Sequence, residues 1–187
     1  MLDRPLVLAS RSPQRRAILT QLGLPFRVAE PAYEERPLPL PPEQLVQTYS
    51  QGKARSVAVG HGDGPVLGVD TEVAVDGRVY GKPADEEAAR TMLAELAGRE
   101  HLVISGLTLL HADGGEQTGL AVTSVRFRAL GADEIDEYVA AREWQGRAGG
   151  YAIQGRGAAL VERIEGDYSN VVGLPVALLV QFLRDRR

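Results

Sequence analysis

The 187-residue sequence contains no cysteine, which excludes a disulfide scaffold, a cysteine zinc site, an iron–sulfur cluster and a thiol nucleophile. No apolar run approaches the roughly 20 residues of a membrane-spanning helix. The apolar stretch near the start is too short for a signal-peptide core. The phosphate loop G-x-x-x-x-G-K-[ST], the dinucleotide-binding motif G-x-G-x-x-G and the serine-hydrolase motif G-x-S-x-G are also missing. Because the sequence has neither a membrane-spanning run nor a signal-peptide core, we expect a cytoplasmic protein that binds no membrane.

Lysine is scarce, because only Lys53 and Lys82 among the 21 basic residues are not arginine. The two side chains are not interchangeable at tight sites, so a lysine that persists here indicates a position requiring a compact ammonium, with chance retention as the alternative. The net charge of −4 argues against a nucleic-acid-binding surface. Residues 1–16 nevertheless hold four arginines against one acid. This cluster indicates either a site for a small anion or a solvated basic face.

Apolar runs alternate with helical patterns along the chain, which predicts an α/β protein. Turn signals at Asp76-Gly77 and at 112–115 predict hairpins, so we expect a mixed twisted sheet with flanking helices rather than a wholly parallel one. At about 150 residues per domain, residues 1–187 form one domain that could contain two lobes. The predicted strands are 5–9, 26–29, 66–70, 102–111, 120–127 and 159–164, and 73–80 is a predicted hairpin. The predicted helices are 13–22 (Leu22 inward), 42–59, from 85, 133–142 and from 175.

The start of the first predicted helix has the features of an anion site. Pro13 fits the first helical position and Ser12 fits the N-cap, directly after a buried strand. A helix N-terminus presents free N–H groups, and Ser10, Ser12 and Arg15 add side-chain donors for phosphate oxygens. The alternative is that Ser12 only caps the helix while Arg15 points into solvent.

Asp70 follows four apolar residues, so we expect it at the carboxyl end of a buried strand, where α/β proteins place their ligand crevice. A carboxylate there is costly unless it is paired or coordinates a cation. With Glu34 and Glu35 on the proline-rich segment 31–42, Asp70 could form an all-oxygen Mg²⁺ or Mn²⁺ site. A buried salt bridge or a turn cap is the alternative for Asp70.

Hydroxyls, arginine, two lysines and carboxylates suit metal-assisted phosphoryl or nucleotidyl chemistry, in which positioning and charge neutralisation do most of the catalysis. They do not suit covalent catalysis. The three histidines form no metal-binding motif, and we interpret His61, His101 and His111 as structural or solvated.

Five segments of the sequence, spread over residues 6–176, resemble motifs of the Maf family of nucleoside triphosphate pyrophosphatases in the family's order. They are Leu8-Ala9-Ser10-Arg11-Ser12-Pro13-Gln14-Arg15-Arg16, Gly68-Val69-Asp70-Thr71, Gly81-Lys82-Pro83, Gly149-Gly150-Tyr151-Ala152-Ile153-Gln154-Gly155 and Ser169-Asn170-Val171-Val172-Gly173-Leu174-Pro175. The resemblance implies a mixed-sheet α/β fold of the Maf/ITPase type, elongated with a central cleft and commonly dimeric. It also implies hydrolysis of a nucleoside triphosphate to monophosphate and pyrophosphate with a divalent cation.

The resemblance also implies roles for individual residues. Asp70 is then the catalytic carboxylate, as proton acceptor for the attacking water or as metal ligand, and Glu35 shares the cation. The implied phosphate-binding residues are Ser10, Ser12, Arg15, Lys53 and Lys82, so both lysines fall on positions where the family has lysine.

Three positions bear on the choice of base. Thr71 and Gln154 resemble the branch that hydrolyses dTTP and UTP, whereas Gln14 departs from the arginine usual in that branch. We therefore expect a dTTP and UTP pyrophosphatase that clears surplus or modified nucleotides. One alternative is the same reaction on 7-methyl-GTP or modified purine triphosphates. The other is a nucleotide-binding regulator of cell division without turnover.

Overall fold

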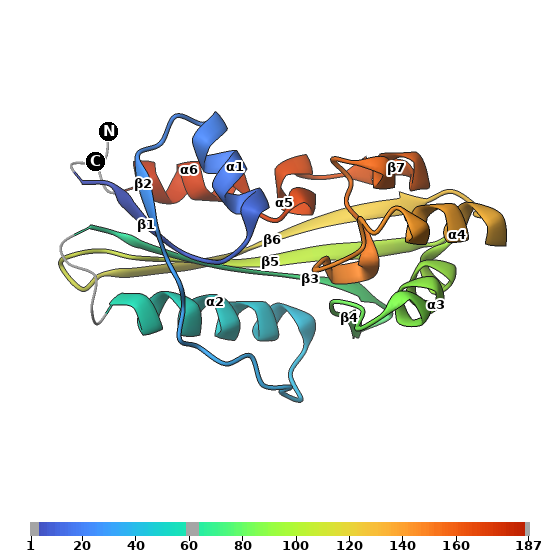
Figure 1. Cartoon of the computed structure of the whole chain (residues 1–187). Helices are drawn as coiled ribbons and strands as arrows, with labels where there is room; N and C mark the ends of the chain where they lie inside the picture. The colour runs from blue at the N-terminus through green and yellow to red at the C-terminus, as the bar shows by residue number, and fades with distance from the viewer. Residues whose placement is uncertain (1–3, 59–63, 186–187) are drawn as a thin grey trace.

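A single seven-stranded sheet runs the length of the molecule in the computed structural model, which describes residues 4–58 and 64–185 (Figure 1). The strands pair in the order β2-β1-β3-β5-β6-β7, and β4 adds to β3. Their bounds are β1 Leu6–Ala9, β2 Phe26–Ala29, β3 Val66–Val75, β4 Arg78–Tyr80, β5 Glu100–Leu110, β6 Glu116–Phe127 and β7 Val161–Glu165. The first three pair in parallel and the others antiparallel, so the predicted mixed α/β sheet is confirmed.

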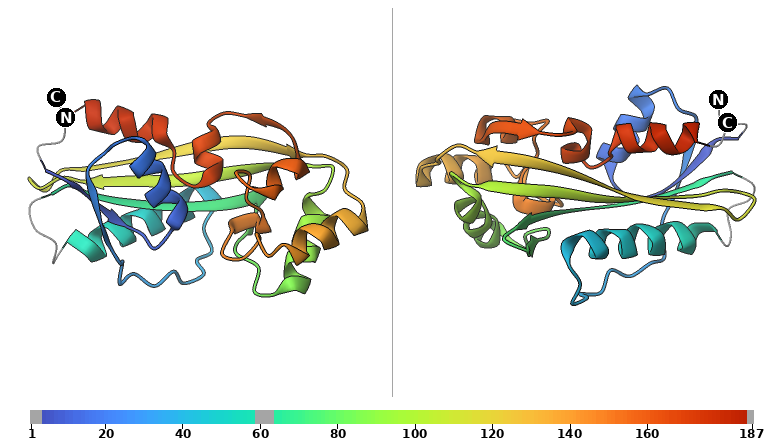
Figure 2. Two further views of the ribbon diagram at one scale, coloured as in Figure 1. Left: turned by 45° about the horizontal axis from the view of Figure 1, so that its top comes forward. Right: turned by 180° about the vertical axis from the view of Figure 1, so that it is seen from behind.

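Helices cover both faces of this sheet, and the molecule is elongated along the direction of its long strands (Figures 1 and 2). Helix α2 packs along one face, while α1, α5 and α6 lie on the other, and α3 and α4 sit together at the far end. Their bounds are α1 Pro13–Gln21, α2 Pro42–Ala58, α3 Glu86–Leu96, α4 Ala132–Ala140, α5 Tyr168–Val172 and α6 Val176–Arg184. No helix within residues 4–58 and 64–185 is long and apolar enough to span a membrane.

Two glycines let α2 lie unusually close to the sheet. A Cβ at Gly68 on β3 would collide with the carbonyl oxygen of Ser50, and one at Gly106 on β5 would collide with that of Val46. The helix turns its apolar face inward at helical spacing, with Val46, Tyr49 and Val57 all buried. This close packing brings the middle of α2 against the middle of β3.

The sequence placed several boundaries wrongly, each for a local reason. Leu22 is 40% exposed rather than inward, because α1 ends at Gln21 and Leu22 is its C-cap. Residues 156–160 form a 3₁₀ helix, so β7 starts later than expected. The five-residue helix α5 is too short to show periodicity and was not predicted. The expected helix end at Val59 lies outside the described residues.

Candidate active site

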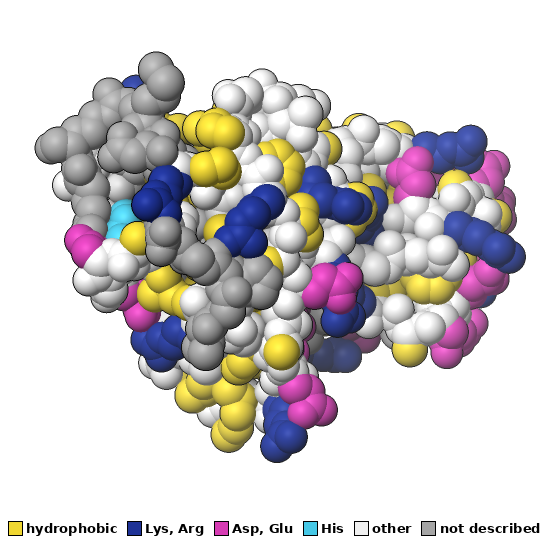
Figure 3. Space-filling view, turned by 60° about the vertical axis from the view of Figure 1, so that its left-hand side comes forward, with side chains coloured by type: hydrophobic (Ala, Val, Ile, Leu, Met, Phe, Trp, Pro, Cys, Tyr) yellow, Lys and Arg dark blue, Asp and Glu magenta, His cyan; other side chains and the backbone are white. Residues whose placement is uncertain are grey.

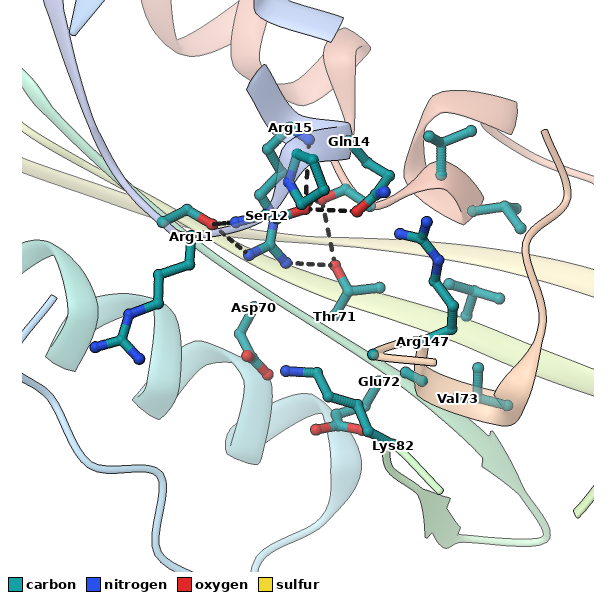
Figure 4. Close-up of a pocket in the computed structure, with 18 of the residues that line it drawn as sticks. Arg11, Ser12, Gln14, Arg15, Asp70, Thr71, Glu72, Val73, Lys82 and Arg147 are labelled. Carbon is teal, nitrogen blue, oxygen red and sulfur yellow. Dashed lines mark hydrogen bonds between the residues drawn. The ribbon is translucent and has the colours of Figure 1, made fainter. Parts of the chain in front are cut away.

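The cleft lies at a gap in the pairing of β3. One edge of this strand pairs with β5 from Val66 to Ala74, whereas the other pairs with β1 only up to Gly68 and with β4 only from Val73. Asp70, Thr71 and Glu72 therefore have no strand neighbour on that edge among the described residues. Strand β1 ends there, and α1 starts directly above the gap (Figure 4). The resulting cavity measures about 550 Å³, a size typical of small-molecule sites.

The sequence predicted Asp70 at the end of its strand, and this prediction is wrong. Strand β3 continues to Val75 because residues 71–74 keep pairing with β5 and residues 73–75 pair with β4. The crevice arises instead because the neighbouring strand β1 stops. Asp70 is only 4% exposed, and Figure 4 shows its carboxylate at the floor of the cleft.

The first turn of α1 faces the cleft with a set of preorganised donors and hydroxyls. Ser12 is the N-cap, and its hydroxyl accepts from the Arg15 N–H. Ser10 is buried, and its hydroxyl accepts from the Ser12 N–H and from the Arg15 guanidinium, each at 3.1 Å. The structure thus brings Ser10, Ser12 and Arg15 together, and Arg15 does not point into solvent.

Arg15 is fixed from both sides of the cleft. Its Nε donates to the carbonyl oxygen of Gly173 at 2.8 Å, and its Nη2 donates to the Thr71 hydroxyl at 3.2 Å. Thr71 also hydrogen-bonds to Ser105 at 2.8 Å. Burial lowers the pKa of Arg15, and the carboxylates of Asp70, Glu35 and Glu72 oppose this shift. Three of the five guanidinium N–H donors are engaged, which leaves two for a ligand.

Lys53 is buried because it occupies the inward face of α2, four residues after Tyr49 and four before Val57. Its ammonium lies 2.5 Å from Asp70 Oδ1 and 2.6 Å from Glu35 Oε1. Burial alone would raise the pKa of Glu35, but the Lys53 ammonium, with Lys82 and Arg15, holds that pKa below its usual value. The structure therefore brings Lys53, Asp70 and Glu35 into one cluster.

The loop before α2 delivers Glu35 to this cluster. The Tyr33 ring fills the space over Gly52, where a Cβ would collide with it, and the Tyr49 hydroxyl donates to the Arg36 carbonyl oxygen at 2.7 Å. Glu34, the adjacent carboxylate expected at the metal site, instead pairs with Arg36 at 2.8 Å and is largely exposed. That expectation is wrong because consecutive residues of the extended loop point in opposite directions.

Glu72 is a third carboxylate of the cleft that the sequence analysis missed. Burial, then the charges of Asp70 and Glu35, raises the pKa of Glu72 to about 8. Two carboxylate oxygens, Oδ2 of Asp70 and Oε2 of Glu72, are buried without a hydrogen-bond partner among the described residues. Period-two alternation would have placed Glu72 on the same face as Asp70, had the strand been extended beyond it.

The remaining predicted residues also line the cleft, and they differ in exposure and in hydrogen bonding. Lys82, after β4, is exposed, and Figure 4 shows its side chain reaching toward Asp70. Gln14 accepts from the Ser12 hydroxyl at 3.0 Å, and Gln154 is exposed. Arg147, which the sequence did not indicate, extends into the cleft from the opposite wall (Figure 4).

The histidines stand apart from the cleft chemistry. His101 is buried and hydrogen-bonds to the Tyr151 hydroxyl at 2.9 Å, and His111 bonds to Gln117 at 2.7 Å. His61 lies outside the described residues.

Sequence comparison identifies the family. The profile of the Maf-like protein family matches residues 5–186. The chain belongs to the Maf family. A dTTP/UTP pyrophosphatase of Moorella thermoacetica is 49% identical over 184 residues, covering 95% of this chain and 93% of the relative. A dTTP/UTP pyrophosphatase of Deinococcus radiodurans is 43% identical over 178 residues, covering 95% and 91%.

Solved structures support the fold of this Maf chain. The Ham1 protein of Staphylococcus aureus aligns with a TM-score of 0.54 at 14% identity, covering 98% of this chain and all of the other. A nucleoside-triphosphatase (dITP/XTP pyrophosphatase) of Mycobacterium abscessus aligns with a TM-score of 0.51 at 18% identity, covering 98% of each chain. At these identities the likeness concerns the fold alone, and it confirms the expected Maf/ITPase-type architecture.

Proposed function

We propose that this Maf protein hydrolyses dTTP and UTP to the monophosphate and pyrophosphate by attack of water. The observation that carries the proposal is the position of Asp70, a buried carboxylate on the cleft floor beneath a helix N-terminus built to bind anions. The names of relatives that are 43–49% identical over nearly the whole chain support the same reaction and the same bases.

In this mechanism the triphosphate lies between α1 and α2. Ser10, Ser12 and the backbone N–H of Gln14 in the first turn of α1 donate to phosphate oxygens, together with the two N–H donors of Arg15 that the described residues leave free. Lys53 and Lys82 neutralise phosphate charge from below. Binding of this kind holds the reacting phosphorus above Asp70.

Asp70 acts as the proton acceptor for the attacking water. One carboxylate oxygen is held by the Lys53 ammonium, while Oδ2 has no partner among the described residues and is available to a water hydrogen. A general base must lie within hydrogen-bond reach of the proton that it removes. The ion pair with Lys53 keeps the Asp70 carboxyl group in place for this step.

A divalent cation fits the same residues. In the alternative role of metal ligand, Asp70 would hold Mg²⁺ or Mn²⁺ together with Glu35, and its unpartnered Oδ2, a hard oxygen donor of the kind these ions prefer, would then be the ligand atom instead of the proton acceptor. No three His, Asp or Glu side chains within the described ranges form a preassembled site, but Mg²⁺ commonly takes one or two carboxylates and substrate phosphates. When bound, the cation neutralises phosphate charge and lowers the pKa of its water.

The choice of base involves Gln14, Thr71 and Gln154 in different ways. The Thr71 hydroxyl is already bonded to Arg15 and Ser105, so Thr71 acts by orienting Arg15. Gln14 and Gln154 lie on the cleft walls and are available to the nucleotide directly.

The first experiment measures pyrophosphate release from dTTP, UTP, CTP, dITP and 7-methyl-GTP with Mg²⁺ or Mn²⁺. Selective cleavage of dTTP and UTP supports the proposal and shows that Gln14 is compatible with pyrimidines. Cleavage of 7-methyl-GTP or dITP instead would keep the reaction and overturn the base assignment. Binding without turnover of any triphosphate would favour the regulatory alternative.

We also propose a cytoplasmic homodimer that binds neither nucleic acid nor membrane. Leu120 and Val122 are exposed on β6, on the same face as exposed Leu102 of β5, which supports burial against a second copy. On the face shown in Figure 3, basic side chains are interspersed with acidic and uncharged ones, which opposes nucleic-acid binding. Sedimentation of the wild type and Val122→Glu tests the dimer, and competition by duplex DNA tests the second statement.

A further inference from the structure

Arg147 is a cation of the cleft with a buried donor atom that has no partner in residues 4–58 and 64–185. Its Nε is buried without a hydrogen-bond partner within the described part of the chain, and burial lowers its pKa. A buried donor left unpaired is destabilising, so a bound ligand that supplies an acceptor would remove this cost.

The backbone around Arg147 is rigid and aims the side chain. The Arg147 N–H donates to the Trp144 carbonyl oxygen and its carbonyl accepts from Gly150, both at 3.1 Å. Gly146, Gly149 and Gly150 all take positive φ near +70°, which glycine adopts without strain. Gly149 also lies directly against the Val73 side chain. This turn holds the guanidinium inside the cleft, on the wall facing Gln14 (Figure 4).

Arg147 lies at a different end of the cleft from the carboxylates. The carboxylates of Asp70, Glu35 and Glu72 all act electrostatically on Arg15. The carboxylate that acts on Arg147 is that of Glu143 instead. Figure 4 shows the same separation, with Asp70 on the left and Arg147 on the right.

Apolar side chains form much of the cleft lining beyond the charged cluster, namely those of Val73, Val103, Val171 and Val172. Gln14 and Gln154 also line the cleft. A triphosphate suits the charged end, whereas a flat base suits apolar walls with a few convergent polar groups.

We propose that Arg147 is a specificity-determining residue that donates a hydrogen bond to the 4-carbonyl oxygen of uracil or thymine. A guanidinium can only donate hydrogen bonds, so it can bond to this carbonyl oxygen. The 4-amino group of cytosine is also a donor, and placing it against the guanidinium would leave two donors facing each other. The inference rests on the proposed hydrolysis of dTTP and UTP, because it assigns the base of that substrate to one end of the cleft.

The test compares kcat/KM for UTP, CTP, dTTP and dCTP in the wild type, Arg147→Met and Arg147→Lys. Methionine keeps the aliphatic stem, so we expect kcat/KM for UTP and dTTP to fall about 10- to 100-fold, the range for a hydrogen bond from a charged donor. The values for CTP and dCTP should change less than about threefold, and most of the loss should appear in KM. Arg147→Lys should fall between the two, because its ammonium can still donate.

Arg156→Met is the matched control, since Arg156 is an exposed arginine outside the cleft lining. It should leave all four values unchanged, and thermal melting should show that every variant is folded. An equal loss on UTP and CTP would overturn the inference by assigning Arg147 to phosphate or sugar, and no loss on either would also overturn it.

Calorimetric binding of UMP and CMP separates this inference from the proposed function. A preference of the wild type for UMP that Arg147→Met abolishes supports the role of Arg147 even if turnover is absent. Turnover of UTP with an unchanged preference in the variant would overturn the inference while leaving the proposed function intact.

Discussion

Two groups of buried ionisable side chains lie at the same sheet and differ in whether an opposite charge accompanies them. In the cleft, Lys53 and Asp70 are 7% and 4% exposed and pair at 2.5 Å. Further along β5, His101 is 1% exposed, and its ring packs edge-on against Phe127 and Tyr151. Burial lowers the pKa of His101 to about 4, with no opposing charge to restore it.

The difference shows what a partner does for a buried charge. A buried group without an opposite charge becomes neutral, whereas one that is paired keeps its charge at a desolvation cost. The His101 group is therefore a neutral part of the core. In the cleft the Lys53 ammonium lies against two carboxylates, and its charge holds the pKa of Glu35 below the usual value despite burial.

Removing Lys53 should strongly destabilise the folded protein, because it leaves the cleft carboxylates without their buried partner. Lys53→Met leaves the Asp70 carboxylate buried and unpaired, so we expect a loss of about 3–5 kcal/mol in the free energy of unfolding. Urea unfolding at pH 7 measures it. Lys82→Met is the control, because this second lysine is exposed and should change stability by at most about 0.5 kcal/mol.

The double variant Lys53→Met/Asp70→Asn sharpens this prediction. Because it removes both charges, it should be more stable than Lys53→Met alone. Equal stability of the two variants would show that the unpaired carboxylate is not the cause of the loss.

His101 should make the protein less stable in acid. Its pKa is about 4 in the folded chain and about 6.5 in the unfolded chain, so between these values the unfolded state binds more protons. Its contribution is complete above pH 6.5 and is lost as the pH falls toward 4, by about 3 kcal/mol in all. Denaturant unfolding from pH 4 to 7 measures this slope. His101→Gln should flatten it while His111→Gln should not, and a slope unchanged in His101→Gln would refute the assignment.

Asp70 should be needed for turnover more than for binding. Asp70→Asn keeps the shape but removes the proton acceptor, so we expect kcat to fall about 100-fold or more. That corresponds to about 2.7 kcal/mol in the barrier. Pyrophosphate release measures turnover, and calorimetry with a non-hydrolysable triphosphate measures binding. Asp76→Asn, the same change at an exposed turn, is the control. Wild-type turnover in Asp70→Asn would make Asp70 structural.

Local sequence signals predicted the parts of the site that depend on one element. Ser12 and Pro13 gave the start of α1, and the alternation around Asp76-Gly77 gave the β3–β4 hairpin, because caps and tight turns involve neighbouring residues. Helical spacing put Tyr49 and Val57 on the inner face of α2, and Lys53 lies between them.

The missed features depend on distant pairings. The cleft exists because β1 ends opposite Gly68, a register that periodicity within β3 does not contain. Glu72 was not predicted because the predicted strand stops at Asp70, the first charged residue after an apolar run, whereas β3 continues beyond it. Arg147 reaches the cleft only through the turn of Gly146, Gly149 and Gly150, whose direction depends on its packing against Val73.

Glu72 is the mirror image of His101 in its pH dependence. Its pKa of about 8 lies above the ordinary value of 4.5, so the folded state holds the proton longer than the unfolded state. Stability should therefore fall as the pH rises from 4.5 to 8, and the penalty is complete above 8. Glu72→Gln removes the titrating group and should be more stable than the wild type at pH 9, with the difference vanishing toward pH 4.5. Denaturant unfolding in buffer with a chelator measures this, and a difference that is independent of pH would mean that Glu72 acts through packing rather than charge.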